Sequence, residues 1–169
     1  MSMYSAAAAG QGLYEASTSR KVVLGTVHHF SDGTNGIVTA RYMSNAATDS
    51  IAAGALVKYG HGVGGGVIGG AMATNDPAVF LAGGLAASVA ATGGYAWVIF
   101  RGIQTNASAT ATLASSAADR VLEHNGAGIG TAAASYATGA AGQALLVGIL
   151  PNAGALAAAA SNTITWLWK

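Results

Sequence analysis

The chain has 169 residues, which is long enough for one domain with its own core and short for two. Charged residues make up 8% of it and the net charge is +1, which excludes a basic nucleic-acid footprint and an acidic disordered tail. Cysteine is absent, so disulfides, thiol nucleophiles and thiolate metal sites are excluded as well. Apolar residues reach 52%, but many of them are alanine, so small side chains must fill much of the core.

The two ends of the chain differ from its middle. Residues 1–19 have no basic region and only a run of four alanines, so we expect an extended N-terminal arm and not a signal peptide. Residues 20–150 are expected to form a β domain, and residues 151–169 a C-terminal tail. Glycines interrupt most alanine-rich windows, and only the segment after Pro151 has a plausible cap and length for a short helix.

The sharpest patterns in the middle of the chain predict strands. Lys21–Phe30 and Gly36–Met43 are rich in β-branched and aromatic residues and flank an Asp-Gly turn, which indicates a hairpin. Gly94–Ile103 is apolar at both alternating sets of positions, so we expect a core strand buried on both faces. The segment "ASATATLAS" (Ala107–Ser115) alternates strictly and predicts a half-buried strand that pairs back.

Turn-into-strand units recur along the chain at short spacing, for example at Ile51–Gly60, Val89–Gly102 and Thr138–Leu150. Their period is too irregular for a solenoid. They predict an all-β fold: a compact β-sandwich or barrel, jelly-roll or tulip-like, with the extended N-terminal arm and C-terminal tail.

The stretch between Asp76 and Arg101 contains no charged residue, so a membrane-spanning helix over Ala78–Phe100 is the competing interpretation. Glycines, Ser88 and Thr92 weaken its hydrophobicity, so we expect no membrane span. A small membrane protein is kept as a lesser alternative.

The glycine run Gly60–Gly70 contains the spacing G-x-G-x-x-G twice. A dinucleotide site also needs a helix at the end of this motif, and the residues that follow show no helical apolar pattern. No P-loop lysine follows either. We therefore expect a flexible or tightly turned connector where backbones approach closely, without a phosphate or cofactor site.

Ionisable side chains give no catalytic or metal site. His28 and His29 are adjacent on a predicted strand, so their rings point to opposite faces and cannot chelate one metal ion. A polar surface or interface role is favoured for them. The densest ionisable cluster is Asp119, Arg120, Glu123 and His124, for which a salt-bridged turn or subunit contact is favoured over acid–base catalysis.

Several further residues are candidates for contacts with other subunits. Arg101 closes the predicted core strand and can extend to its rim. Trp166 and Trp168 alternate at the end of the tail, so both rings lie on one side if the tail is extended. The candidate interaction residues are Tyr4, Tyr14, Arg101, Arg120, Glu123, His124, Trp166 and Trp168.

The order of these elements resembles the head decoration, or capsid-cement, proteins of tailed bacteriophages. In that family a "GxxWV...G" strand follows a glycine turn, and a small-residue strand and an "A...G..L.VxL" ending come later. The likeness covers roughly residues 20–150. The residues that carry it are Gly94, Trp97, Val98 and Gly102 in the first part, and Gly130, Ala132, Gly142, Leu145, Val147 and Leu150 in the last.

The resemblance implies a compact β domain, often trimeric, that sits on the outside of an icosahedral shell and joins neighbouring capsid subunits. The implied partners are the major capsid protein and further copies of the chain, as a homotrimer or a dimer, with no nucleic acid and no membrane. The implied location is the virion surface, after assembly in the host cytoplasm. It implies no enzyme activity, no cofactor and no metal. Another virion building block, such as a tail subunit, is the nearest alternative.

Overall fold

The computed structural model of the chain describes residues 10–31, 36–59, 66–71, 82–108, 121–125, 128–131, 146–149 and 161–166, and from residue 103 onward it describes the path of the backbone. All the regular secondary structure in these residues is β-strand, which confirms the all-β prediction. The strands are β1 (Val27–Ser31), β2 (Ile37–Asn45), β3 (Leu56–Tyr59), β4 (Val67–Ala71), β5 (Ala82–Ala86), β6 (Tyr95–Ser108), β7 (Val121–Asn125), β8 (Gly128–Thr131), β9 (Leu146–Ile149) and β10 (Ser161–Trp166).

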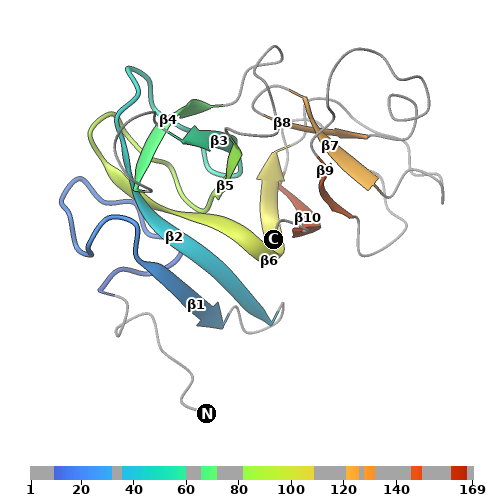
Figure 1. Ribbon diagram of the computed structural model, residues 1–169, viewed down its shortest axis with the longest axis horizontal. Coiled ribbons are helices and arrows are strands. Elements are labelled where there is room, and N and C mark those ends of the chain that lie inside the picture. The colour runs from blue at the N-terminus through green and yellow to red at the C-terminus, as the bar shows by residue number, and fades with distance from the viewer. Residues whose placement is uncertain are drawn as a thin grey trace.

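Five strands close into a barrel in the order β2, β4, β3, β5 and β6 (Figure 1). Neighbours run antiparallel except β2 and β4, which run parallel where Ser44 pairs with Val67 and Asn45 pairs with Ile68. The pairing of β2 with β6 closes the ring, so that each of the five strands has a neighbour on both sides. β1 lies outside the ring and pairs with β2.

The barrel part of strand β6 is buried on both faces from Ala96 to Ile99, as its sequence predicts. Val98 lies in the barrel interior together with Met43 of β2. Trp97 lies in a second apolar layer on the outside of the barrel, with its ring centroid 4.9 Å from that of Phe30 and 5.1 Å from that of Tyr42. Because both Trp97 and Val98 are fully buried, the prediction of a core strand is confirmed.

The outer layer is covered by residues 10–26, which we call the N-terminal strap. Leu13 of the strap is buried in this layer. Ser17 and Tyr95 exchange backbone hydrogen bonds, with N···O distances of 3.3 and 2.8 Å. Residues 10–19, which the sequence assigns to an extended arm, therefore lie against the barrel and supply part of its core.

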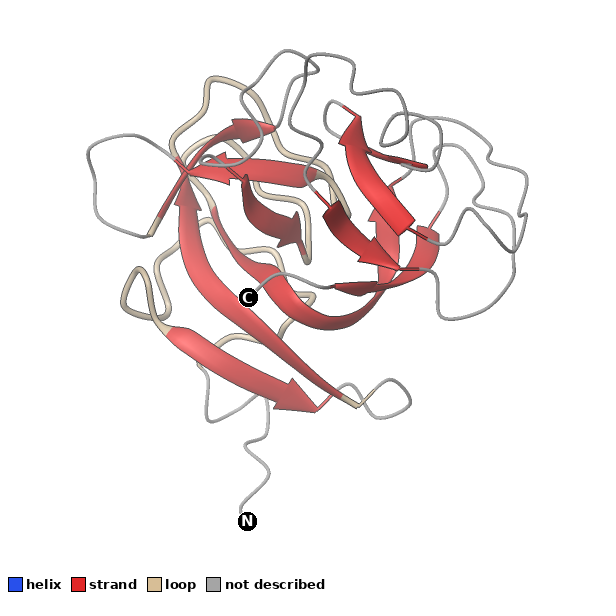
Figure 2. Ribbon diagram, turned by 45° about the vertical axis from the view of Figure 1, so that its right-hand side comes forward, coloured by secondary structure: helices blue, strands red, loops and turns tan. Residues whose placement is uncertain are grey.

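Strand β6 continues beyond the barrel into a second sheet, where it is followed by β10, β9, β7 and β8 (Figure 2). β10 belongs to the predicted C-terminal tail. Its Trp166 pairs with Gly102 of β6 on one side and with Gly148 of β9 on the other. This part of the tail is thus an inner strand of the chain's own sheet.

The described strands test the predicted hairpin and the alternative of a membrane-spanning helix. The hairpin is confirmed, because β1 and β2 pair from Val27–Arg41 to Ser31–Ile37 without a register shift. A helix over 78–100 is wrong for its described part, because residues 82–86 and 95–100 form strands. Among the described residues no helix has the length and apolar character needed to cross a membrane.

Two local predictions fall largely or wholly outside the described residues. Of the predicted strand Ala107–Ser115, the first two residues end β6 and the rest lie outside the described part of the chain. The expected short helix after Pro151 lies outside it as well.

Gly102 is the point at which β6 passes from the barrel to the second sheet. Its φ is +107°, and an added Cβ would lie 2.7 Å from the carbonyl oxygen of Ile37. We expect Gly102→Ala to lower the free energy of unfolding by about 2–4 kcal/mol through backbone strain and overpacking, measured by urea denaturation. Gly93→Ala is the matched control, because Gly93 also has a positive φ, +71°, but faces open space and should cost only about 1 kcal/mol. Equal losses in the two variants would contradict the close contact.

Candidate functional site

A buried polar cluster joins the strap to the barrel around the hydroxyl group of Tyr42. This hydroxyl donates to Oε1 of Gln11 at 2.7 Å and accepts from the backbone N–H of Lys21 at 3.2 Å. Nε2 of Gln11 also donates to the carbonyl oxygen of Glu15 at 2.7 Å. The backbone carbonyl oxygen of Gln11 accepts from Nε1 of Trp97 at 3.2 Å. The polar groups that the strap and the barrel bury together are therefore hydrogen-bonded to one another.

The chemistry of this cluster fits a structural role. Burial raises the pKa of Tyr42 above the ordinary value of 10.0, and the hydrogen bond from the Lys21 N–H opposes that rise in part. The hydrogen-bond partners of the phenol are amide groups, which do not take up its proton near neutral pH. Sequence reasoning missed the cluster, because Gln11 lies in a polar, glycine-flanked stretch with no periodic pattern.

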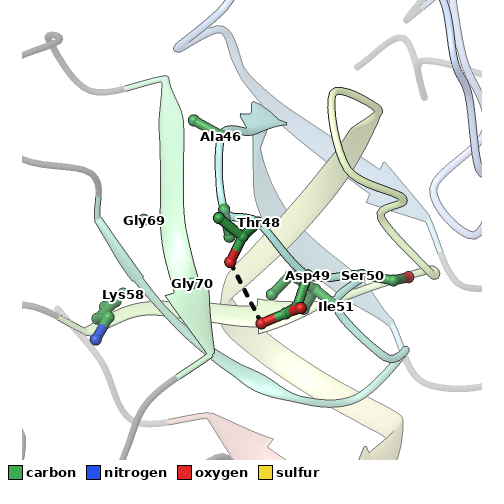
Figure 3. A pocket seen from close by; sticks show the side chains of 9 residues that line it. Ala46, Thr48, Asp49, Ser50, Ile51, Lys58, Gly69 and Gly70 are labelled. Carbon is green, nitrogen blue, oxygen red and sulfur yellow. Dashed lines mark hydrogen bonds between the residues drawn. The ribbon is translucent and has the colours of Figure 1, made fainter.

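An open groove of about 470 Å³ lies between the loop that follows β2 and the strands β3 and β4 (Figure 3). Residues 46–51 form one wall, and Lys58, Gly69 and Gly70 form the other. The dashed line in Figure 3 marks the hydrogen bond from the Thr48 hydroxyl to the Asp49 carboxylate, 3.4 Å long.

The loop of this groove is held in place by Asn45, which is 1% exposed. Its Nδ2 donates to the carbonyl oxygens of Asp49 at 2.9 Å and Ala90 at 2.8 Å, and its Oδ1 accepts from the N–H of Ala47 at 3.0 Å. One buried amide thereby ties the loop after β2 to the turn before β6. Nothing in the sequence around Asn45 marks it as buried, since asparagine is usually exposed in turns.

The groove offers a carboxylate (Asp49), an ammonium group (Lys58) and the hydroxyls of Thr48 and Ser50. No histidine lines it. Within the part of the chain that the structure describes, no group of three or more histidine or carboxylate side chains could hold a metal ion. The groove can therefore contact a polar group, but it lacks a paired acid and base.

The glycine run leads into a strand. Residues 60–65 lie outside the described residues, and Gly66 is followed directly by β4, so the helix that a phosphate cradle needs is not formed there. A Cβ on Gly66 would lie 2.7 Å from Cβ of Leu24 in the strap. The expected close approach of two backbones is confirmed at this glycine.

His28 and His29 lie on opposite faces of β1, as predicted. The ring of His28 packs against Phe30, with centroids 4.8 Å apart, on the side of the outer apolar layer. Nδ1 of His29 lies 3.0 Å from Oγ1 of Thr39 on the other side of the hairpin. The two imidazoles therefore do not converge on one site.

The His29 side of the β1–β2 hairpin carries cations together with exposed apolar side chains. Arg41 pairs with Val27, and its guanidinium carbon lies 5.5 Å from the ring centroid of Phe100. Arg101, opposite Thr39 on β6, is exposed. We call this surface the cationic face; its residues are Val27, His29, Ile37, Arg41, Phe100 and Arg101. The sequence predicts a contact role for Arg101 and a surface or interface role for His29, but it does not predict the face as a whole, because its residues meet only through the strand register.

The candidate interaction residues fall into three groups. Tyr14 is 43% exposed on the strap, and Arg101 is exposed on the cationic face. Glu123 and His124 lie in β7 and Trp166 lies in β10, two strands of the second sheet that are separated by β9. The candidates outside the described residues are Tyr4, Arg120 and Trp168, as is Asp119 of the ionisable cluster.

Comparisons with known proteins yield no relative. No family model matches the chain, and no curated protein and no solved structure is significantly similar to it. What the chain does must therefore be inferred from its own residues.

Removing the Tyr42 hydroxyl should uncouple the strap from the barrel. We expect Tyr42→Phe to lower the free energy of unfolding by about 1–3 kcal/mol, because Oε1 of Gln11 and the N–H of Lys21 lose a buried partner. Tyr95→Phe is the matched control: the two rings stack 6.0 Å apart, but the described structure shows no hydrogen bond from the Tyr95 hydroxyl, so its loss should cost less than about 0.5 kcal/mol. Indistinguishable urea midpoints for the two variants would show that the cluster contributes nothing.

The raised pKa of Tyr42 also predicts a pH dependence. A phenol whose pKa is higher in the folded state stabilises the fold fully below the unfolded pKa of 10.0, and this contribution is lost as the pH rises through the folded value. Denaturation of the wild type above pH 10.0 should therefore show a steeper fall in stability than denaturation of Tyr42→Phe. Parallel stability curves for the two proteins would be evidence against the shift.

Proposed function

We propose that this chain is a structural virion protein that binds the outer surface of an icosahedral phage capsid and ties neighbouring major capsid subunits together. It does so as a homotrimer or dimer and carries out no reaction. Its interaction surfaces, and no pocket, perform this function.

The observation that carries the proposal is the group of exposed apolar side chains beside the outer edge of β1, which pairs with no other strand in the described part of the chain. Val27 is 44% exposed and Ile37 is 68% exposed, and both lie on the cationic face. Val23, in the strap just before β1, is 73% exposed. Exposed apolar side chains next to an unpaired strand edge favour a contact with another protein. A stable contact needs on the order of 1,000 Å² of buried surface, and a chain with few charges can bury that area without stranding unpaired ions.

The residues that resemble the capsid-cement family have clear structural roles in this chain. Trp97 and Val98 fill the outer layer and the barrel interior, and Gly102 allows β6 to leave the barrel. The surface role implied by the sequence resemblance is the basis of the proposal. These residues make no contact that identifies the partner.

Whether an N-terminal arm contributes to shell binding cannot be tested by deleting residues 1–19. Residues 10–19 include Gln11 and Leu13, which are buried, so their removal would disturb the core. Residues 1–9 lie outside the described residues, and their deletion alone tests whether an arm contributes to shell binding.

The decisive experiment mixes the purified protein with undecorated shells of the phage that encodes it. We expect ordered density on the shells in electron cryo-microscopy and a higher shell melting temperature, because bound protein stabilises the assembled form. Ile37→Asp should weaken binding by about tenfold or more, since it places a charge in the proposed contact. Val89→Asp is the matched control, because Val89 is 49% exposed but lies in the turn before β6.

Shells that bind no protein, or that bind both aspartate variants as well as the wild type, would contradict the proposal. Polymers formed by the protein without shells would favour the alternative, a tail subunit or another virion building block.

A further inference from the structure

The strap contains an exposed pair of basic residues, Arg20 and Lys21. The side chains of residues 18–21 are all exposed, and none of these residues belongs to a strand. The other basic side chains that the structure describes lie within strands β2, β3 and β6; they are Arg41, Lys58 and Arg101. Among the described residues, the bonds of the strap pair are therefore the ones that a protease specific for basic residues reaches without opening a sheet.

The backbone on either side of the basic pair is fixed to the barrel, but the pair itself is held weakly. Before the pair, Ser17 exchanges two hydrogen bonds with Tyr95; after it, the Gly25 N–H donates to the carbonyl oxygen of Tyr42 at 2.8 Å. Between these points, the described backbone makes one hydrogen bond to the barrel, from the Lys21 N–H to the Tyr42 hydroxyl at 3.2 Å. A protease binds its substrate as an opened segment, so this short stretch opens more readily than a strand.

The two bonds that follow a basic residue differ in their surroundings. The bond after Arg20 joins two exposed residues. The bond after Lys21 leads to Val22, which is half-buried against the outer apolar layer. A Cβ on Gly10 would lie 3.3 Å from the carbonyl oxygen of Lys21, so the strap also shields the carbonyl group that a protease would attack there. Cleavage after Arg20 is thus favoured over cleavage after Lys21.

The segment before the basic pair covers Trp97 with few residues. Of residues 10–20, those that are buried are Gln11 and Leu13. The indole N–H of Trp97 donates to the carbonyl oxygen of Gln11 at 3.2 Å. Both buried residues lie on the N-terminal side of the bond after Arg20. A cut at this bond therefore separates one side of the cover of Trp97 from the barrel.

We propose that the bond between Arg20 and Lys21 is a processing site for a protease that cleaves after arginine, and that the cut uncovers Trp97. Hydrolysis breaks the bond between the carbonyl carbon of Arg20 and the nitrogen of Lys21. Water supplies the hydroxyl group of the new carboxyl group and the proton of the new amine. This regulatory step goes beyond the proposed function, since it requires no shell.

Loss of the covalent link changes how strongly the strap is held. Before the cut, the segment binds the barrel intramolecularly, at an effective concentration on the order of millimolar. After the cut, residues 1–20 are a separate peptide with two buried side chains among those described, and it dissociates at micromolar protein concentration. Val22 and Leu24 stay attached to the outer layer, and Trp97 keeps the ring of Phe30 as a neighbour. The barrel therefore stays folded with Trp97 uncovered on one side.

Limited digestion with trypsin, followed by mass spectrometry over time, tests the site. The protein carries Arg120→Gln, so that a cut at this residue, which lies outside the described part of the chain, does not compete. We expect cleavage after Arg20 to be at least about tenfold faster than cleavage at the basic residues within strands β2, β3 and β6. Arg20→Gln should remove this cut, whereas Lys21→Gln, the matched control, should leave its rate within about twofold.

Release of the strap is tested on the same digest. Gel filtration at micromolar concentration reports whether residues 1–20 leave the barrel, and NMR reports the hydrogen exchange of the Trp97 indole N–H. We expect the peptide to elute separately and the indole N–H to exchange at least about tenfold faster, because it loses its acceptor and its cover. A synthetic peptide of residues 1–20 at millimolar concentration should restore slow exchange, which distinguishes uncovering from unfolding.

Three results would overturn the proposal. The first is cleavage within a strand, or after Lys21, at a rate equal to or above that after Arg20. The second is a strap that remains on the barrel at micromolar concentration after the cut. The third is rapid indole exchange that persists in excess peptide, since cleavage would then unfold the barrel and not uncover Trp97.

Discussion

The fold depends on burying Trp97 from the outside of the barrel. The barrel part of β6, residues 95–100, is apolar at both alternating sets of positions, so closing the barrel covers Val98 but leaves Trp97 on the outer surface. Burial of a tryptophan side chain stabilises a fold by about 4–6 kcal/mol, a large share of the stability of a small domain. The N-terminal strap covers Trp97, and the carbonyl oxygen of Gln11 in the strap accepts a hydrogen bond from the indole N–H.

The strap then determines what remains free for function. It covers the Trp97 side of β2, and the chain enters β1 directly from it, so one face of the β1–β2 hairpin belongs to the core. The other face carries Arg41 and Ile37 and stays at the surface. Because successive residues of a strand point to opposite sides, the burial of one set of residues fixes the exposure of the other. The exposure of this face is therefore a direct consequence of how the core is covered.

Much of the barrel could be predicted from local patterns, because strands rich in β-branched and aromatic residues have a clear sequence signal. The hairpin and β6 were of this kind. The strap was not, since its buried residues Gln11 and Leu13 are separated by glycine and follow a run of alanines. The cationic face could not be found either: Arg41 and Arg101 lie far apart in sequence and meet through a β2–β6 register that shifts beside Thr39. β5, before β6, consists mainly of alanine and glycine, which fit both helices and strands. Its strand conformation is therefore clear only from its pairing with β3 and β6.

The same small residues limit the number of positions that can take part in the proposed contact. Alanine and glycine allow backbones to approach closely, as where Gly66 lies under Leu24, but they offer little for a partner to recognise. Recognition must then come from backbone groups and from a small number of large or charged side chains. In the described part of the chain, the rim of the barrel at β1 places both kinds of group side by side, with Arg41 one strand away from an unpaired edge. The proposed contact is therefore placed at this rim.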